Sequence, residues 1–166
     1  MRAPFAEQRA YLFGQAPGIV EGGERLPWRG RAGRTLRRWL ELDEDAFYDT
    51  FYCASVTRCY PGRAASGRGD RTPTPREREL CAFWRRRELA LLRPRLVVTV
   101  GGLALRELLS HTLLTEAIGD RYELDGVPVV PLPHPSGASS WLNIPANRVR
   151  LERALALVRD ELERLS

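Results

Sequence analysis

The sequence contains no lysine, so all 26 of its basic side chains are arginines, and the formal net charge is +5. Arginine binds phosphate through planar, bidentate hydrogen bonds, so this composition is compatible with a nucleic-acid partner. An all-arginine composition also results from a GC-rich genome, and an excess of five charges is modest. Charge alone therefore allows DNA binding without establishing it.

Cysteine and histidine are scarce, with three cysteines and two histidines in the chain. An odd cysteine count without a CxxC pair argues against a disulfide framework and against a four-ligand zinc or iron–sulfur site, so no metal or other cofactor is expected. No apolar run approaches the ~20 residues that span a bilayer, and Met1–Ala10 lacks the apolar centre of a signal peptide. We expect a monomeric, cytoplasmic protein with no membrane partner.

The 166 residues predict one domain covering 1–166. Apolar runs predict four strands, at Ala10–Phe13, Phe51–Val56, Leu96–Val100 and Val127–Leu132. Helices are predicted at Arg34–Leu42, from the Thr74 cap to Leu92, at Leu103–Ser110, and from Pro145 to the C-terminus. Strands that alternate with helices indicate an α/β class, a three-layer α/β/α domain with a central, mainly parallel four-stranded sheet.

Helical faces and loops complete this prediction. Trp39 and Trp84 lie on predicted helical faces and are expected in the core, and His111, at a helix end, is expected to be structural. The glycine-rich segment Gly14–Gly33 and the arginine-rich segment Pro61–Pro75 are predicted loops, the second of them exposed and mobile.

Three polar or glycine-rich segments directly follow predicted strands. They are Gly14–Gly18 (GQAPG), Ser55–Arg58 and His134–Ser136. Ligands of open α/β sheets bind outside the carboxyl ends of the strands. The topology therefore predicts that these three segments converge on one site.

These segments resemble motifs of the uracil-DNA glycosylase superfamily. GQAPG at Gly14–Gly18 and HPSGAS at His134–Ser139 resemble its two hallmark motifs. PWRGRAG at Pro27–Gly33, SVTRCYP at Ser55–Pro61 and RTPTP at Arg71–Pro75 resemble PFVGRAG, NVVKCRP and RTPTP of its thermostable, iron–sulfur-carrying branch. The resemblance covers about Leu12 to Trp141, with the motifs in the expected order.

The resemblance implies a DNA glycosylase that flips a uracil or another deaminated base out of DNA and hydrolyses its N-glycosidic bond, which initiates base excision repair. A departing base carries negative charge, so the enzyme needs an oriented donor, for which His134 is the candidate. Trp28 stands where the family has a stacking Phe. The other substrate-binding candidates are Gly14, Ala16, Pro17 and Gly18.

Several positions depart from the family pattern. Cys59 and Cys81 match two cysteines of the iron–sulfur branch, but its N-terminal cysteine pair has no counterpart here. Ser55 replaces the uracil-reading Asn of that branch, and a serine cannot offer the paired donor and acceptor of the amide. Ala16 and Gly18 stand where the strictest uracil enzymes carry an Asp that activates water and a Tyr that excludes thymine.

The motifs therefore do not identify the group that activates water. Gln15 can orient a water molecule but cannot deprotonate it. Glu21 and Glu24 lie in the following loop, where plain solvation is the simpler explanation of an acidic residue. Asp70 stands near the place where a related, covalently bonding branch carries a His, and is a further catalytic candidate. A largely dissociative reaction does not require a strong base.

A flipping enzyme also fills the gap that the base leaves in the stack. The family uses a large apolar residue two positions past the Ser of HPS, but this position holds the small Ala138. Trp141 or Leu142 is the alternative wedge, or else Trp141 packs against the last helix and Ala138 enters the groove. The remaining candidates for DNA contact are Arg29, Arg31, Ser136, Ser139 and, for a phosphate, Arg148.

Two other functional classes fit parts of the sequence. A DNA-binding module that kept the fold and lost the chemistry would explain the missing Asp and Asn. An enzyme that acts on free nucleosides would need no basic loop, so the arginines near the motifs count against it.

Overall fold

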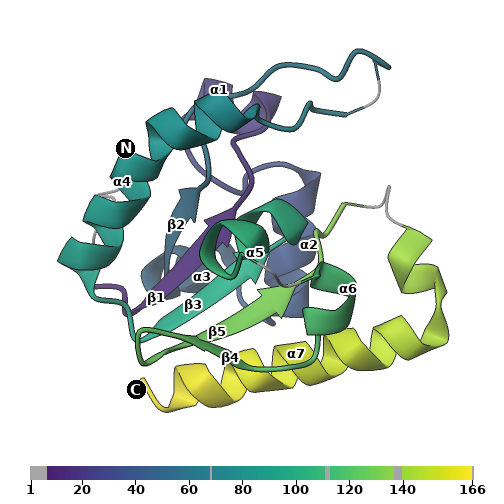
Figure 1. The fold of residues 1–166 in the computed structure, drawn as a ribbon. Helices are drawn as coiled ribbons and strands as arrows, with labels where there is room; N and C mark the ends of the chain where they lie inside the picture. The colour runs from purple at the N-terminus through teal and green to yellow at the C-terminus, as the bar shows by residue number, and fades with distance from the viewer. Residues whose placement is uncertain (1–6, 68, 111–112, 137–139, 166) are drawn as a thin grey trace.

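A computed structural model of the chain describes residues 7–67, 69–110, 113–136 and 140–165 (Figure 1). One sheet forms the centre, with strand order β2-β1-β3-β5-β4. Its strands are β1 (Ala10–Gly14), β2 (Phe51–Ser55), β3 (Leu96–Val100), β4 (Tyr122–Leu124) and β5 (Val127–Leu132). The first three and β5 pair in parallel, and β4 pairs antiparallel with β5.

The four predicted strands are confirmed, but the sheet has a fifth strand, β4, that was not predicted. This strand is only three residues long and lies at the sheet edge. The turn Asp125–Gly126, in which both residues have positive φ (50° and 80°), joins it to β5. An Asp-Gly turn of this kind is a strong hairpin signal, so the sequence did contain a marker for the strand.

Helices flank the sheet on both faces. The predicted helices correspond to α2 (Arg31–Trp39), α4 (Pro75–Leu92), α5 (Gly102–Leu108) and α7 (Pro145–Glu163). Helix α4 begins with the expected capping box, in which Thr74 and Glu77 bond reciprocally to each other's backbone. The additional helices are α1 (Ile19–Glu24), α3 (Glu44–Thr50), α6 (Leu114–Ala117) and the 3-10 turn η1 (Ser140–Asn143). Segment Gly14–Gly33, predicted as a loop, thus contains α1 and the start of α2.

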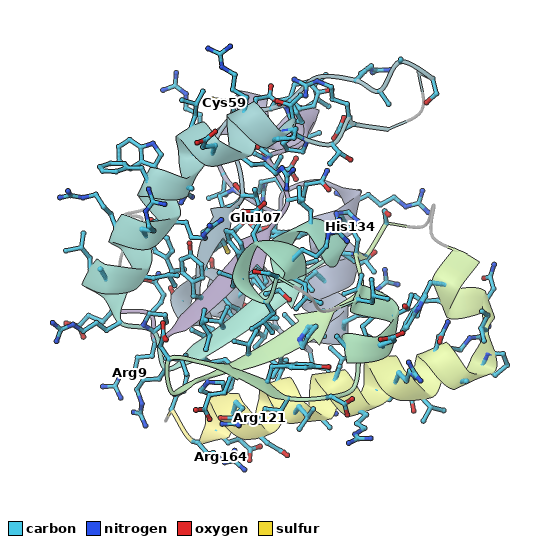
Figure 2. The ribbon with its side chains drawn as sticks, in the orientation of Figure 1. Arg9, Cys59, Glu107, Arg121, His134 and Arg164 are labelled. Carbon is cyan, nitrogen blue, oxygen red and sulfur yellow. The ribbon has the colours of Figure 1, made fainter. Side chains whose placement is uncertain are left out.

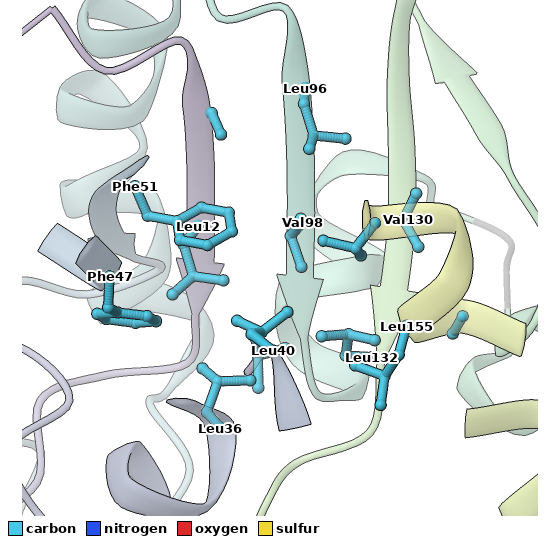
Figure 3. Close-up of a cluster of buried hydrophobic side chains, with 14 of the residues drawn as sticks. Leu12, Leu36, Leu40, Phe47, Phe51, Leu96, Val98, Val130, Leu132 and Leu155 are labelled. Atoms are coloured by element: carbon cyan, nitrogen blue, oxygen red, sulfur yellow. The ribbon is translucent and has the colours of Figure 1, made fainter. Parts of the chain in front are cut away.

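Side chains that alternate along the strands build two cores, one on each face of the sheet. Leu12, Val98 and Val130 belong to the core on the face covered by α2, α3 and α7, and this core also contains Phe47 (Figure 3). Tyr11, Phe13 and Val97 point to the opposite face, where α5 and the end of α4 pack. The arrangement is the predicted three-layer α/β/α architecture.

The two helical tryptophans have different surroundings. Trp39 is half-buried and packs against the first core, the one that contains Leu12 and Phe47, which is close to its predicted core position. Trp84 is 53% exposed, so its predicted core position is wrong. No residue of α4 is fully buried, and the apolar side chains with which this helix packs against the sheet are Leu89 and Leu92. Among the described residues, no helix is long and apolar enough to cross a membrane.

The carboxyl ends of the parallel strands lie together at one end of the sheet. Gly14, the last residue of β1, lies in register beside Ser55, the last residue of β2. Val56 and Thr57 then donate backbone hydrogen bonds to the carbonyls of Gly14 and Gln15 (2.9 and 3.2 Å). The loops after β1 and β2 are therefore locked together, and His134 follows β5 at the same end of the sheet (Figure 2).

Candidate active site

A cavity of about 870 Å³ lies at the carboxyl ends of these strands. It is formed by the segment from Gly14 to Ala32, the end of β2 with the residues after it, and His134. The structure brings most of the predicted site residues together in this cavity. Those that line it are Gly14, Gln15, Ala16, Pro17, Gly18, Trp28, Arg31, Ser55, Asp70 and His134.

His134 has a defined hydrogen-bonding state at the mouth of the cavity. The backbone N–H of Ser136 donates to its Nδ1 at 3.3 Å. Because a backbone N–H can only donate, Nδ1 must be the unprotonated nitrogen of the neutral ring, and the proton is on Nε2. The surrounding protein removes part of the ring's hydration and lowers the pKa of His134 below its ordinary value of 6.5. The side chain is therefore a neutral Nε2–H donor at pH 7.

Trp28 forms an aromatic wall beside His134, with 6.3 Å between the ring centroids. The indole lies directly against Gly14, where a Cβ atom would be only 2.8 Å from its Cζ2. Any larger residue at position 14 would therefore push the indole away. This contact explains why the first motif begins with glycine in this chain.

The Trp28 backbone is in the left-handed region, with φ of 61°, which a bulky residue rarely adopts. Arg37 donates to the Trp28 carbonyl (2.9 Å) and the Tyr48 hydroxyl donates to the Pro27 carbonyl (2.5 Å). Gly33 lies so close that a Cβ atom there would be 1.7 Å from the Trp28 oxygen. These neighbours fix an unfavourable conformation that presents the ring to the cavity.

Two carboxylates lie in the cavity next to Gly18. A Cβ atom at Gly18 would be 2.6 Å from Glu21 Oε2 and 3.5 Å from Asp70 Oδ2. Glu21 also accepts a hydrogen bond from the Gly30 backbone N–H (2.8 Å), and Asp70 accepts one from the Tyr60 hydroxyl (3.0 Å). The space that a side chain at position 18 would fill is therefore acidic.

The remaining polar candidates differ in their availability. The Ser55 hydroxyl donates to the Thr57 carbonyl at 2.7 Å, so only its oxygen lone pairs are left for a ligand. Gln15 lines the cavity and can offer both a donor and an acceptor. Glu24 does not line it and instead pairs with Arg29 at 2.8 Å.

The residues that were predicted to contact DNA differ in their surroundings. Arg31 is exposed at the cavity, whereas Arg29 is held by both Glu24 and Glu44. Trp141 and Leu142 are half-buried and pack against the core that contains Leu12 and Phe47. This is the alternative in which Trp141 packs within the protein. Their carbonyls accept hydrogen bonds from Asn147 (2.9 Å) and Arg148 (2.8 Å). Three further residues lie outside the described residues: Ala138, Ser139 and His111.

The sequence analysis placed the Ser55–Arg58 segment at the site but assigned no role to Arg58, which lines the cavity. Arg58 pairs with Glu88 of α4, and Glu88 also accepts hydrogen bonds from the hydroxyls of Tyr11 (2.8 Å) and Tyr52 (3.1 Å). Burial, followed by the nearby Glu88 carboxylate, raises the pKa of Tyr11 well above 10.0, so its hydroxyl remains a donor. The network ties the cavity wall to α4. The position of Arg58 just after β2 was the available signal.

The iron–sulfur branch raises the question of a metal cluster. Cys59 is exposed and Cys81 is half-buried on α4, which supplies two thiols. Among the described residues, no group of three or more His, Cys, Asp or Glu side chains is arranged to hold a metal ion. These residues therefore do not fit a four-thiolate cluster.

Comparison with known proteins places this site in a family. The sequence profile of the Uracil DNA glycosylase superfamily matches residues 3–156. This chain belongs to the uracil-DNA glycosylase superfamily. Its cavity is lined by GQAPG after β1 and by His134 after β5, which lie in the two segments whose resemblance to this superfamily's motifs is described in the sequence analysis.

Individual relatives agree with this membership. The chain is 29% identical over 133 residues to the type-4 uracil-DNA glycosylase of Thermotoga maritima, an alignment that covers 78% of this chain and 66% of the relative. It is 29% identical over 134 residues to the type-4 enzyme of Archaeoglobus fulgidus, covering 75% and 64%. The chain thus spans slightly less than two thirds of either enzyme. It is also 30% identical over 129 residues to a DNA polymerase of Bacillus phage SP01, covering 77% of this chain and 13% of the polymerase.

Proposed function

We propose that this member of the superfamily is a monofunctional DNA glycosylase that hydrolyses the N-glycosidic bond of a flipped-out uracil or another deaminated base and so initiates base excision repair. The single observation that carries the proposal is the pairing of His134 and Trp28 in one cavity. One supplies a neutral N–H donor and the other an aromatic face, and a departing base needs both.

The proposed reaction gives the residues of the cavity distinct roles. As the bond between C1′ and the base breaks, its electron pair leaves with the base, and the water oxygen bonds to C1′. His134 Nε2–H stabilises the charge that develops on the base, a contribution worth ~2.7–4 kcal/mol for one oriented donor. Gln15 orients the water, and the Asp70 carboxylate stabilises the cationic sugar and accepts the proton of the water.

The geometry also bears on which base is accepted. With its proton bonded to Thr57, Ser55 presents only an acceptor to a base. Such a site recognises an N–H on the base edge, which uracil, hypoxanthine and xanthine all carry. The absence of a side chain at Gly18 removes a steric block, but the Glu21 carboxylate occupies part of that space. We therefore propose that the substrate is a deaminated base, and that it is not restricted to uracil.

The partner in this proposal is DNA, single- or double-stranded, and the protein acts as a monomer in the cytoplasm. The net charge of +5 and the exposed Arg31 at the cavity support a phosphate-bearing substrate.

The decisive test is an excision assay on end-labelled oligonucleotides. Each carries one uracil, hypoxanthine, xanthine or thymine, in single-stranded and duplex form, and alkali then cleaves any abasic site. We expect strand cleavage with at least one deaminated base, and much less with His134→Ala. DNA binding in a gel-shift assay without any alkali-labile site would instead support the inactive DNA-binding module, for which the absent motif Asp, replaced by Ala16, is the favouring observation.

A further inference from the structure

Two large apolar side chains are exposed at the mouth of the cavity. Ile19 is 57% exposed and Val20 is 43% exposed, and both line the cavity as the first residues of α1. Exposed apolar groups beside a binding cavity commonly mark a surface that is covered in a complex. Their position directly after the Gly14–Gly18 motif places them next to the proposed reaction site.

Helix α1 holds these side chains in a fixed position. Backbone bonds from Gly22 to Gly18 and from Arg25 to Glu21 (both 2.9 Å) close its turns. The Glu21 side chain accepts the Gly30 N–H at 2.8 Å and so ties α1 to the segment before α2. Ile19 and Val20 therefore project from a supported element.

The residues expected to fill a gap in DNA are poorly suited to that task. Position 138 holds a small alanine. Trp141 and Leu142 pack against the first core and are joined to α7 by the hydrogen bonds of Asn147 and Arg148. Moving either side chain into DNA would cost its packing in the protein.

Exposed arginines near Ile19 and Val20 favour DNA as the occupant, and the two carboxylates of the same cavity, Glu21 and Asp70, accept hydrogen bonds from Gly30 and Tyr60. Arg25 and Arg31 are exposed at the same cavity, and neither forms an ion pair within the described part of the chain. An apolar pair that shares its cavity with exposed arginines matches a base stack flanked by phosphates. A second protein surface would need no such charge.

We propose that Ile19, with Val20 beside it, is the apolar wedge that enters the base stack when the target nucleotide is flipped into the cavity. The proposal rests on the proposed glycosylase function. It gives α1 the task of holding the gap open in duplex DNA, where extrusion of a base costs a few kcal/mol in lost stacking and pairing.

The test compares excision from duplex and single-stranded oligonucleotides by the double variant Ile19→Ala/Val20→Ala under single-turnover conditions. Because a single strand needs little unstacking, we expect a loss of about tenfold or more on duplex and about twofold or less on single strands. Leu91→Ala is the matched control, since Leu91 is 75% exposed on α4 and does not line the cavity. The control should behave like the unsubstituted protein on both substrates.

A second measurement reports the wedge without any excision. Duplex DNA with 2-aminopurine beside a tetrahydrofuran abasic-site analogue should brighten when the unsubstituted protein unstacks it, and brighten much less with the double variant. Equal losses on both strand forms, or no loss on duplex, would overturn the wedge. If the unsubstituted protein removes no base from either form, the glycosylase proposal fails, and the 2-aminopurine signal alone decides the role of Ile19 and Val20.

Discussion

The backbone N–H of Ser136 donates a hydrogen bond to Nδ1 of His134 at 3.3 Å, which places the proton of the neutral imidazole on Nε2. A donor that acts mainly on the departing base contributes to the transition state more than to binding. We predict that His134→Ala lowers the single-turnover excision rate by about a hundredfold or more. DNA affinity, measured by fluorescence anisotropy, should change little. Equal excision rates for the two proteins would remove His134 from the mechanism.

The pH dependence of excision follows from the same pair. Partial desolvation at the mouth of the cavity lowers the pKa of His134 below 6.5, so the neutral form prevails at pH 7. Protonation of Nδ1 would break the Ser136 contact, so we predict that the excision rate falls as the pH drops through the lowered pKa. Because the unfolded chain binds this proton at higher pH than the folded one, stability also decreases as the pH falls below about 6.5. A pH–rate profile of His134→Ala should lack this step.

The close approach of Gly33 to Trp28 gives a prediction about stability. A Cβ atom at position 33 would overlap the Trp28 carbonyl, so the backbone around the indole must shift. We predict that Gly33→Ala destabilises the fold by about 1–3 kcal/mol and reduces excision. Gly23→Ala is the control, because a Cβ atom there meets nothing within 4 Å. Urea denaturation measures both variants, and similar midpoints for the two would contradict the proposed tight contact.

The junction between the Pro61–Pro75 segment and α4 depends on an ion pair. Arg71 donates to both carboxylate oxygens of Glu77 (2.6 and 2.8 Å), and this contact, with the Thr74 backbone bond, lowers the pKa of Glu77 to about 2. A depressed carboxyl pKa contributes stability above the unfolded value of 4.5, and this contribution is lost as the pH falls toward about 2.

We therefore predict that Glu77→Gln, which retains a capping amide but no charge, is less stable than the unsubstituted protein at neutral pH. The difference should shrink between pH 4.5 and about 2. Thermal denaturation at a series of pH values measures this effect. A stability difference that stays constant with pH would show that the cap, and not the ion pair, accounts for it.

The sequence predicted the central strands well because β1, β3 and β5 are short apolar runs buried on both faces. It also predicted the meeting of the Gly14, Ser55 and His134 segments, since parallel strands bring their carboxyl ends to one edge. The prediction for Trp84 was wrong because sequence periodicity identifies the apolar face of a helix. It does not show whether another element covers each side chain on that face.

Long-range contacts set the remainder of the site. The positive φ of Trp28 depends on contacts with Gly33, Arg37 and Tyr48, and no local sequence pattern predicts it. The position of Asp70 beside Gly18 likewise requires the fold of the intervening loop. Motif spacing could therefore nominate these residues but could not show which carboxylates face the cavity.

Trp141 separates the two remaining explanations of how duplex DNA is held open. Its half-buried ring packs against the first core, and its carbonyl accepts from Asn147. We predict that Trp141→Ala lowers the stability by about 2 kcal/mol, less than for a fully buried tryptophan. Excision should then fall to a similar extent on duplex and single-stranded DNA, because the change affects folding and not unstacking. A loss confined to duplex would instead make Trp141 the wedge and would exclude that role for Ile19, since both residues cannot fill the same gap.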